Sequence, residues 1–307
     1  MAAPTDKIAI IIPTIGREED LGRMLGSLAN QTRLPDQVII LDEAGEAKRL
    51  ANNYPQLKTL VTSFPRGSAS AKRNRGMKLV APEITLVGLM DDDIVLEPKA
   101  LELMLNFWRE ASPEVGGVSF NLANHPPIFA LRLKSLGMTS KLALYDSRPG
   151  LVLRSGIHTL IGFVPENTSA QWLPTTAVVY RRQVLYEQAF DEWYQGYSYL
   201  EDLDLSYSVG KKYKLAVLAG ARFYHYPSLI GRTHWYSFGK MEVANRLHFV
   251  RKHPELSPVR CYLALTIRIF ISIYLGFREM DGSFFKRACG NIAGFVSVAT
   301  PRKQPGA

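Results

Sequence analysis

The six residues Leu89–Ile94 read LMDDDI, and this stretch decides how the fold is interpreted. It closes the apolar run Ile84–Met90, which is typical of a buried strand. Three adjacent carboxylates raise one another's pKa, so a neutralising cation stabilises them, and hard oxygen ligands favour magnesium, manganese or calcium. The alternative is a capping cluster for a helix near Pro98. Ligands of open α/β sheets bind beyond the carboxyl ends of strands, which favours a binding site here.

The segments on both sides of this stretch alternate between strand and helix patterns, as a doubly wound α/β sheet requires. Short β-branched apolar runs predict buried strands, and apolar residues at helical spacing predict helices. Residues 122–170 are irregular and rich in Pro, Gly and Ser. The expected strands are 7–13, 37–41, 58–63, 84–90, 117–121, 177–181, 215–218 and 221–224, and the expected helices are 21–28, 69–79, 101–111, 183–189 and 201–209.

Composition and charge limit the class of protein. The chain has 307 residues, 47% hydrophobic and 21% charged, which excludes a disordered or collagen-like protein. Its two cysteines suggest a reducing compartment. Residues 210–307 hold 16 Lys and Arg against 4 Asp and Glu and carry +12, whereas residues 1–209 carry −3; the two parts together give the formal net charge of +9. We therefore expect one domain over residues 1–230 and a basic, helical tail over residues 231–307.

Further carboxylates and one histidine are candidates for chemistry. Glu201 and Asp202 open an expected helix, where they either compensate the helix dipole or supply a general base. His225 ends an apolar strand and is either a packing residue or a metal ligand. Asp42 and Glu43 follow the second strand, where a carboxylate could contact a nucleotide. Glycine-rich phosphate loops of the GxGxxG and GxxxxGK[ST] types are absent from the sequence, so a metal clamped by carboxylates becomes the natural holder of a diphosphate.

In this order, the motifs resemble those of the family 2 glycosyltransferases, inverting enzymes with the GT-A fold, over residues 7–227. The resemblance implies a nucleoside-diphosphate sugar donor, a glycan or lipid-linked acceptor and a divalent ion, Mn²⁺ or Mg²⁺. The matching segments are Ile10–Thr14 (IIIPT), Val38–Glu43 (VIILDE), Ala71–Gly76 (AKRNRG), Asp91–Asp93, Arg181–Arg182, Phe190–Glu192 (FDE), Glu201–Leu205 (EDLDL) and His225.

The resemblance also implies a role for each matching residue. Asp202 would be the general base that deprotonates the acceptor hydroxyl, and Glu201 would orient it. Asp93 would bind the metal on the diphosphate, with His225 completing the metal shell. The expected nucleotide-sugar contacts are Pro13, Thr14, Asp42, Arg73, Asp91 and Asp92. The QxxRW motif of processive polysaccharide synthases is absent after His225, so we expect transfer of a single sugar.

The second expectation concerns the tail, which we expect to bind a membrane surface. Residues 261–277 are apolar except for Arg268 and two mildly polar residues, and as a helix they would span about 25 Å, less than the hydrocarbon thickness. Arg260 and Arg278 share one helix direction, which leaves the opposite face apolar and predicts peripheral binding through residues 258–287 at the cytoplasmic membrane face. The alternatives are a helix packed on the catalytic domain or on a partner of a homo-oligomer, and a short transmembrane span.

Two other classes of function are less favoured. A catalytically silent nucleotide-binding or scaffold protein on the same fold would not need both Asp93 and Asp202. Nucleic-acid binding would interleave cations with exposed aromatic residues, whereas here the aromatic residues lie within apolar runs. The sequence therefore predicts a transferase of polysaccharide or cell-envelope biosynthesis.

Overall fold

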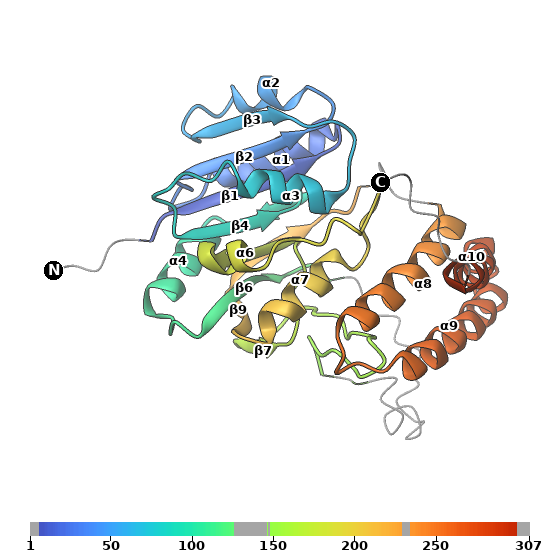
Figure 1. The fold of residues 1–307 in the computed structure, drawn as a ribbon. Helices are drawn as coiled ribbons and strands as arrows, with labels where there is room; N and C mark the ends of the chain where they lie inside the picture. The colour runs from blue at the N-terminus through green and yellow to red at the C-terminus, as the bar shows by residue number, and fades with distance from the viewer. Residues whose placement is uncertain (1–5, 126–145, 147, 229–233, 300–307) are drawn as a thin grey trace, which may run out of the picture. The chain divides into compact units, whose positions relative to one another are not determined.

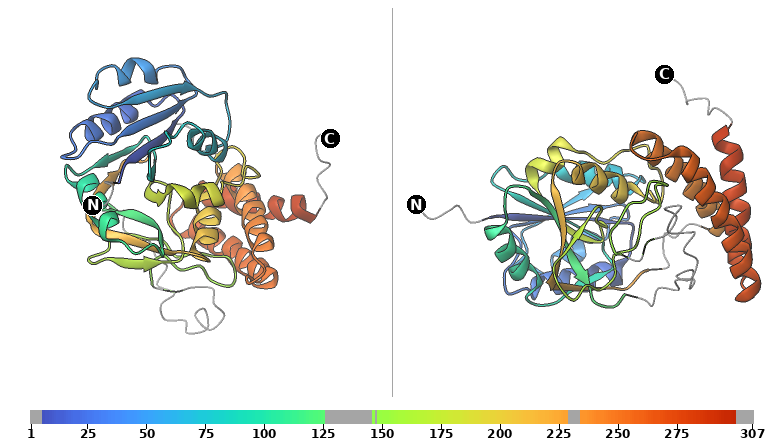
Figure 2. Two further views of the ribbon diagram at one scale, coloured as in Figure 1. Left: turned by 60° about the vertical axis from the view of Figure 1, so that its left-hand side comes forward. Right: turned by 90° about the horizontal axis from the view of Figure 1, so that it is seen from below.

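The computed structural model describes residues 6–125, 146, 148–228 and 234–299. Within these residues the chain forms two compact units. One comprises residues 6–125 and 160–228, and the other comprises 146, 148–159 and 234–299. Figures 1 and 2 show a sheet with helices in the first unit and long helices in the second.

The described strands of the first unit form one nine-stranded sheet in the order β3-β2-β1-β4-β8-β6-β9-β5, with β7 paired to β9. Strands β1, β2, β3, β4, β6 and β9 run in one direction and β8, β5 and β7 run in the other, so the sheet is mostly parallel. The strands are β1 (Ile8–Thr14), β2 (Gln37–Asp42), β3 (Thr59–Ser63), β4 (Leu86–Met90), β5 (Ile94–Leu96), β6 (Val115–Leu122), β7 (Thr168–Ala170), β8 (Ala177–Arg181) and β9 (Lys214–His225).

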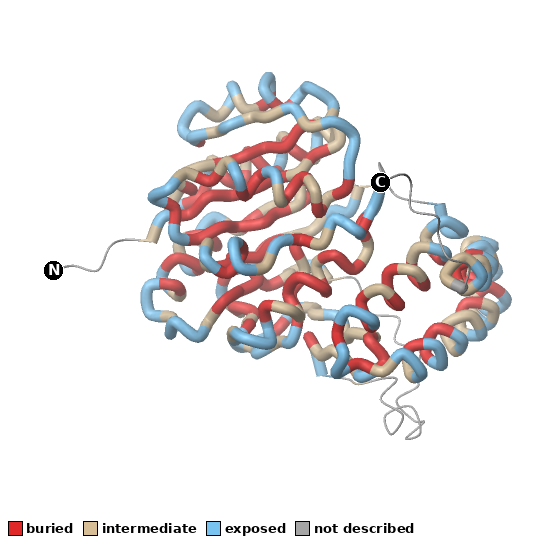
Figure 3. Tube along the Cα trace, viewed as in Figure 1, coloured by how far each residue is buried: buried red, intermediate tan, exposed pale blue. Residues whose placement is uncertain are grey.

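Helices cover both faces of this sheet because both faces of its central strands are apolar. Along β1, Ile8, Ile10 and Ile12 pack with α1 (Glu18–Ala29), α2 (Ala47–Ala51) and α4 (Ala100–Glu110). The alternate residues Ala9 and Ile11 pack on the other face with α3 (Ala69–Met77), α6 (Arg182–Glu187) and α7 (Glu201–Gly210). The buried core therefore follows the sheet on both sides (Figure 3).

The α/β fold predicted from the alternation is confirmed, and several details differ, among them β5 and α2, where no strand or helix was expected. The two short strands expected at 215–218 and 221–224 are one strand, β9, which continues through Gly220. The irregular stretch contains a short strand, β7. The three aspartates do not cap a helix, because β5 follows them and α4 starts only at Ala100.

The second unit contains α8 (Trp235–Lys252), α9 (Pro258–Arg278) and α10 (Gly282–Ala299). Ser257 caps α9 by accepting a hydrogen bond from the amide of Arg260, and Pro258 follows it at the first helical position, where its missing N–H costs nothing. Residues 148–159 belong to the same unit, and the carbonyl of Gly156 accepts a hydrogen bond of 2.6 Å from Arg246 of α8.

Candidate functional site

The candidate site lies at the carboxyl ends of neighbouring parallel strands. Thr14 at the end of β1 is in register with Asp42 at the end of β2, and β4 runs beside β1 and ends at Met90, just before the three aspartates. The antiparallel pairing of β5 with β9 sets Ile94 opposite His225. The sheet order therefore brings together side chains that are as far apart in the sequence as Thr14 and His225.

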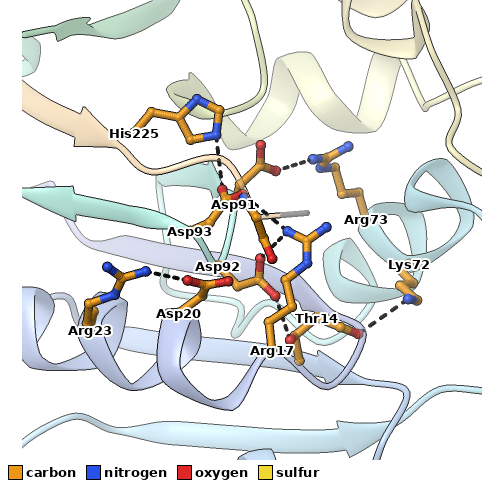
Figure 4. Close-up of polar contacts among 11 residues, drawn as sticks. Thr14, Arg17, Asp20, Arg23, Lys72, Arg73, Asp91, Asp92, Asp93 and His225 are labelled. Carbon is orange, nitrogen blue, oxygen red and sulfur yellow. Dashed lines mark hydrogen bonds and ion pairs between the residues drawn. The ribbon is translucent and has the colours of Figure 1, made fainter. Parts of the chain in front are cut away.

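Asp92 is buried and held by two partners from the end of β1 and the turn after it. The hydroxyl of Thr14 donates a hydrogen bond of 2.6 Å to Asp92 Oδ2, and Arg17 donates one of 2.9 Å to Oδ1 (Figure 4). Burial raises the pKa of Asp92 to about 6, although the Arg17 charge and the Thr14 hydrogen bond both favour the ionised form. Asp92 thus anchors the turn after β1 to the end of β4.

Asp93 meets a cation, an imidazole and a backbone amide. Arg17 lies 3.2 Å from Asp93 Oδ2, His225 Nε2 lies 3.1 Å from Oδ1, and the amide of Ser228 donates to Oδ2 at 3.2 Å. Burial opposes ionisation, but the hydrogen bond and charge of His225 outweigh it, so the pKa of Asp93 lies below its ordinary value. Asp93 is therefore the most readily ionised of the three aspartates.

The donor set at Asp93 suits a hard divalent ion. A carboxylate oxygen and an imidazole nitrogen converge there, and Mg²⁺ or Mn²⁺ in nucleotide sites commonly uses one or two carboxylates together with substrate phosphates. In the described part of the chain, no three His, Cys, Asp or Glu side chains are grouped so that they could hold a metal ion by themselves. Asp93 and His225 would therefore hold an ion whose remaining ligands come from the diphosphate and water.

Arg73 of α3 links Asp91 to the second acidic group. One guanidinium nitrogen donates to Asp91 Oδ1 at 2.8 Å, and the other forms an ion pair with Glu201 at the start of α7. Ser70, one turn earlier on α3, donates to the second oxygen of Glu201 at 2.5 Å. Burial lowers the pKa of Arg73, but the charges of Glu201 and Asp91 more than compensate, so the guanidinium stays charged. Both oxygens of Glu201 are thus occupied.

Asp202 differs from Glu201 in its exposure and its contacts. Its side chain is half-buried, and Oδ1 accepts a hydrogen bond of 2.8 Å from the amide of Leu203. Burial raises the pKa of Asp202 above its ordinary value and that of Glu201 to about 7. Leu200, just before this pair, is buried with a φ of 77°, a backbone conformation that is strained for a branched residue. The start of α7 is therefore a constrained segment that presents Asp202.

The residues expected around the nucleotide surround the ends of β1 and β2. Asp42 is buried, and its carboxylate accepts hydrogen bonds from the amides of Ala44 and Ala47 at 3.0 and 2.8 Å. The partly exposed carboxylate at the end of β2 is instead that of Glu43, which pairs with Lys72 at 2.6 Å. Pro13 is half-buried in β1. The buried side chains of Asp42 and Thr14 are thus hydrogen-bonded within the protein at the ends of β2 and β1.

Three residues of this network were not singled out from the sequence. Arg17 is one cation among 37 Lys and Arg, and only its position in the turn directly after β1 could have indicated it. Ser70 had no signal apart from its place one turn before Arg73. Lys72 lies inside the basic segment that carried the family resemblance, but its burial against Glu43 depends on the packing of α3 beside β2.

The fold and the acidic strand ends place the chain in the GT-A class of folds. Two solved structures support this fold: the mannosyltransferase PcManGT from Pyrobaculum calidifontis, with a TM-score of 0.58, 12% identity and coverage of 96% of this chain and 90% of that chain, and S. aureus TarS 1-349, with a TM-score of 0.53, 16% identity and coverage of 90% and 74%.

The sequence comparisons identify the family. The model of glycosyl transferase family 2 matches residues 9–161, and the chain belongs to this family. The uncharacterized glycosyltransferase YwdF of Bacillus subtilis (strain 168) is 35% identical over 103 residues, 32% of this chain and 37% of that protein. Poly(ribitol-phosphate) beta-N-acetylglucosaminyltransferase TarP of Staphylococcus aureus (strain N315) is 30% identical over 116 residues, 36% of this chain and 35% of that protein. The chain therefore aligns with little more than a third of each relative.

Proposed function

We propose that this chain is an inverting glycosyltransferase that moves a single sugar from a nucleoside-diphosphate sugar to a hydroxyl of a glycan or lipid-linked acceptor. The observation that carries the proposal is the chain of contacts from Asp91 through Arg73 to Glu201, which ties the strand end that carries Asp93 to the helix start that carries Asp202. The solved relatives include TarS in complex with UDP-GlcNAc and PcManGT in complex with GDP-Man and Mn²⁺, which supports a nucleotide-sugar donor.

In this proposal the acceptor side is served by Asp202. Its carboxylate takes the proton of the acceptor hydroxyl while the hydroxyl oxygen forms a bond to the anomeric carbon. On the opposite face, the bond between that carbon and the diphosphate oxygen breaks, so the configuration inverts. Glu201 is held by Ser70 and Arg73, and we assign it the positioning of the Asp202 segment rather than proton transfer. The raised pKa of Asp202 suits a group that must accept a proton.

The donor side is served by the aspartates and their partners. Asp93 and His225 would hold Mn²⁺ or Mg²⁺, which when bound supplies positive charge to the leaving diphosphate. Asp91, whose side chain is 30% exposed, is available to the ribose. The remaining proposed nucleotide-sugar contacts are Pro13, Thr14, Asp42, Arg73 and Asp92; of these, Thr14 and Asp92 hold each other in place.

We further propose that the enzyme works in cell-envelope polysaccharide biosynthesis, as a peripheral protein of the cytoplasmic membrane face attached through residues 258–287. The name of TarP, a poly(ribitol-phosphate) glycosyltransferase, supports a polymeric envelope acceptor. The alternative is a catalytically silent nucleotide-binding or scaffold protein on the same fold, which would bind a donor without turning it over.

The test is release of nucleoside diphosphate from a panel of nucleotide sugars, with Mn²⁺, Mg²⁺ or chelator and with membrane extract as the acceptor source. We expect one donor to turn over, with kcat lowered by about 10²–10⁴ in Asp202→Asn while donor binding is kept. Asp204→Asn is the matched control, because Asp204 lies on the same helix and is buried away from solvent. Donor binding without turnover would favour the scaffold alternative. If no donor binds and none turns over, the proposal is contradicted altogether.

A further inference from the structure

The outer face of α9 is mostly apolar, and the hydroxyl of Thr266, which is exposed on this side, donates a hydrogen bond to the carbonyl of Tyr262. Val259, Leu263, Phe270 and Phe277 point in nearly the same direction, since their spacings of four and seven residues bring them to one side of an α-helix. Their exposed fractions are 79%, 44%, 66% and 68%. The helix of 21 residues is about 32 Å long, and it is the one described helix whose length and composition would allow it to cross a membrane.

The opposite side of the same helix carries a charged contact with the neighbouring helix. Arg268 of α9 points to Glu242 of α8, with 3.7 Å between its Nε and the Oε1 of Glu242. Glu242 is only 5% exposed and also accepts two hydrogen bonds from Arg287 of α10, at 3.0 and 2.6 Å. Burial raises the pKa of Glu242, but the two arginines outweigh it and keep the carboxyl ionised. The unit thus holds one charged cluster among buried apolar residues such as Leu247 and Leu265, while large apolar side chains of α9 stay exposed.

Small residues let the three helices approach closely around this ionic centre. A Cβ added at Gly290 of α10 would lie 2.1 Å from the carbonyl oxygen of Tyr236, and one added at Gly294 would lie 2.8 Å from Val243, both on α8. A Cβ added at Gly276 of α9 would lie 2.8 Å from the ring of Phe285 of α10. Glycines spaced four apart at a helix contact are the packing found between helices in lipid. The Gly276–Phe285 contact and the Arg268–Glu242 pair both turn one side of α9 toward its neighbours, so its apolar face cannot turn inward without breaking them.

The width of the exposed face of α9 distinguishes between a partner helix and a membrane surface as the structure that covers it. A partner helix in a coiled coil would cover a narrow seam flanked by charged residues. Here the flanking positions hold Tyr262 and Tyr274, 41% and 53% exposed, so the face is wide and edged by aromatic residues with polar tips. Tyrosines of this kind are enriched where one end is apolar and the other is wet, as at a membrane interface. The neighbouring face of α10 adds Ile292 and Val296, 52% and 63% exposed.

The net positive charge of the second unit also favours a membrane surface. Residues 234–299 hold nine Lys and Arg against four Asp and Glu, and one of those four, Glu242, is buried in the ionic centre. Lys240, Arg278 and Lys286 are exposed. Cations beside an apolar helix face are attracted to anionic headgroups and bring that face into the boundary of the acyl chains.

We propose that the outer face of α9, with the adjoining face of α10, lies in the surface of an anionic lipid bilayer, the helix axis parallel to the membrane plane and Phe270 and Phe277 below the headgroups. This deepens the peripheral attachment within the proposed function and leaves the proposed sugar transfer aside. The ionic centre at Glu242 holds Arg268 away from the lipid, so the face that enters the membrane carries no charge along its centre.

The experiment measures binding of the full chain to vesicles, independently of sugar transfer. Vesicles of phosphatidylcholine with about one third phosphatidylglycerol are sedimented with wild type and with the double variant F270E/F277E, and we expect about a 100-fold loss of partitioning in the variant. The matched control L60E/L103E makes the same charge change at exposed leucines of the first unit, 41% and 40% exposed, and should stay within about twofold of wild type.

A second readout reports insertion directly and separates lipid from a second copy of the chain. Cys289 is exposed on the outer face of α10, whereas Cys261 is buried and burial raises the pKa of its thiol to about 11, so a thiol-reactive NBD dye labels Cys289. Its fluorescence should shift to the blue with anionic vesicles, and less with phosphatidylcholine alone. Absence of wild-type binding, or equal binding by both double variants, would overturn the proposal. So would a lipid-free dimer, seen by sedimentation velocity, that F270E/F277E dissociates.

Discussion

Replacing Arg73 by methionine should make the stability of the first unit depend on pH in a range where the wild type is nearly flat. Arg73 is buried and pairs with Glu201, whose pKa burial raises to about 7 even with the arginine present. The unfolded chain ionises this carboxyl near pH 4.5, so the folded state holds an extra proton between pH 4.5 and about 7. The wild-type contribution therefore falls as the pH rises through that range and is constant above it.

Without the guanidinium, the pKa of Glu201 should rise further, because its burial is no longer opposed by a positive charge. The folded variant then keeps its extra proton above pH 7, and each further pH unit costs about 1.4 kcal/mol relative to wild type. The difference in the free energy of unfolding should widen by about 2–3 kcal/mol between pH 7 and 9. Methionine keeps most of the buried volume, so the pH-independent part of the loss comes from the broken ion pairs with Asp91 and Glu201 and not from a cavity.

The assay is urea unfolding followed by tryptophan fluorescence at several pH values from 6 to 9, since Trp108, Trp172 and Trp193 all lie in the first unit. The matched control is Arg75→Met, because Arg75 lies on the same helix and is exposed. Its difference from wild type should not change with pH. A constant difference for Arg73→Met across this range would show that Arg73 does not hold the ionised form of Glu201.

Two further predictions concern the metal ligands and the helical unit. Arg17→Gln removes the cation that shares Asp93 with His225, so Mn²⁺ should bind the nucleotide-free protein about tenfold more tightly by calorimetry; unchanged affinity would show that Arg17 does not compete with the ion. Gly290→Ala should destabilise the second unit by about 1–3 kcal/mol in thermal unfolding, because the added methyl meets the backbone of α8, whereas Gly282→Ala, which meets nothing within 4 Å, should leave it unchanged or slightly more stable.

Much of the first unit could be predicted because its signals are local. The apolar runs of β1, β2 and β4 bury both faces, and such runs are distinctive in the sequence. Strand β5 was missed since it has only three residues, directly after the aspartates. Gly220 made β9 look like two strands, although pairing with β6 and β5 carries the strand through it.

The contacts of the site are less predictable than its members, because they depend on partners far away in the sequence. That Asp91 and Glu201 share Arg73 follows from α3 and α7 lying on the same face of the sheet, which no spacing in the sequence reveals. The rotation of α9 is a similar case. The sequence predicted an apolar face opposite Arg260 and Arg278, but it could not show that Arg268 pairs with Glu242 of α8.

The charges at the strand ends also explain how one acidic cluster can serve two purposes. Three adjacent aspartates require neutralising charge, and the fold supplies it from Arg17 and Arg73 without an added ion. The pKa values of Asp93 and Asp202 nevertheless shift in opposite directions. Asp93, beside His225, has a lowered pKa and offers an ionised oxygen to a metal without first losing a proton. Asp202 is half-buried, and the Leu203 amide and the Arg73 charge offset its loss of hydration only in part, so its pKa is raised and it gains more from accepting a proton. Environments that push two carboxyl pKa values in opposite directions are what a metal ligand and a general base require.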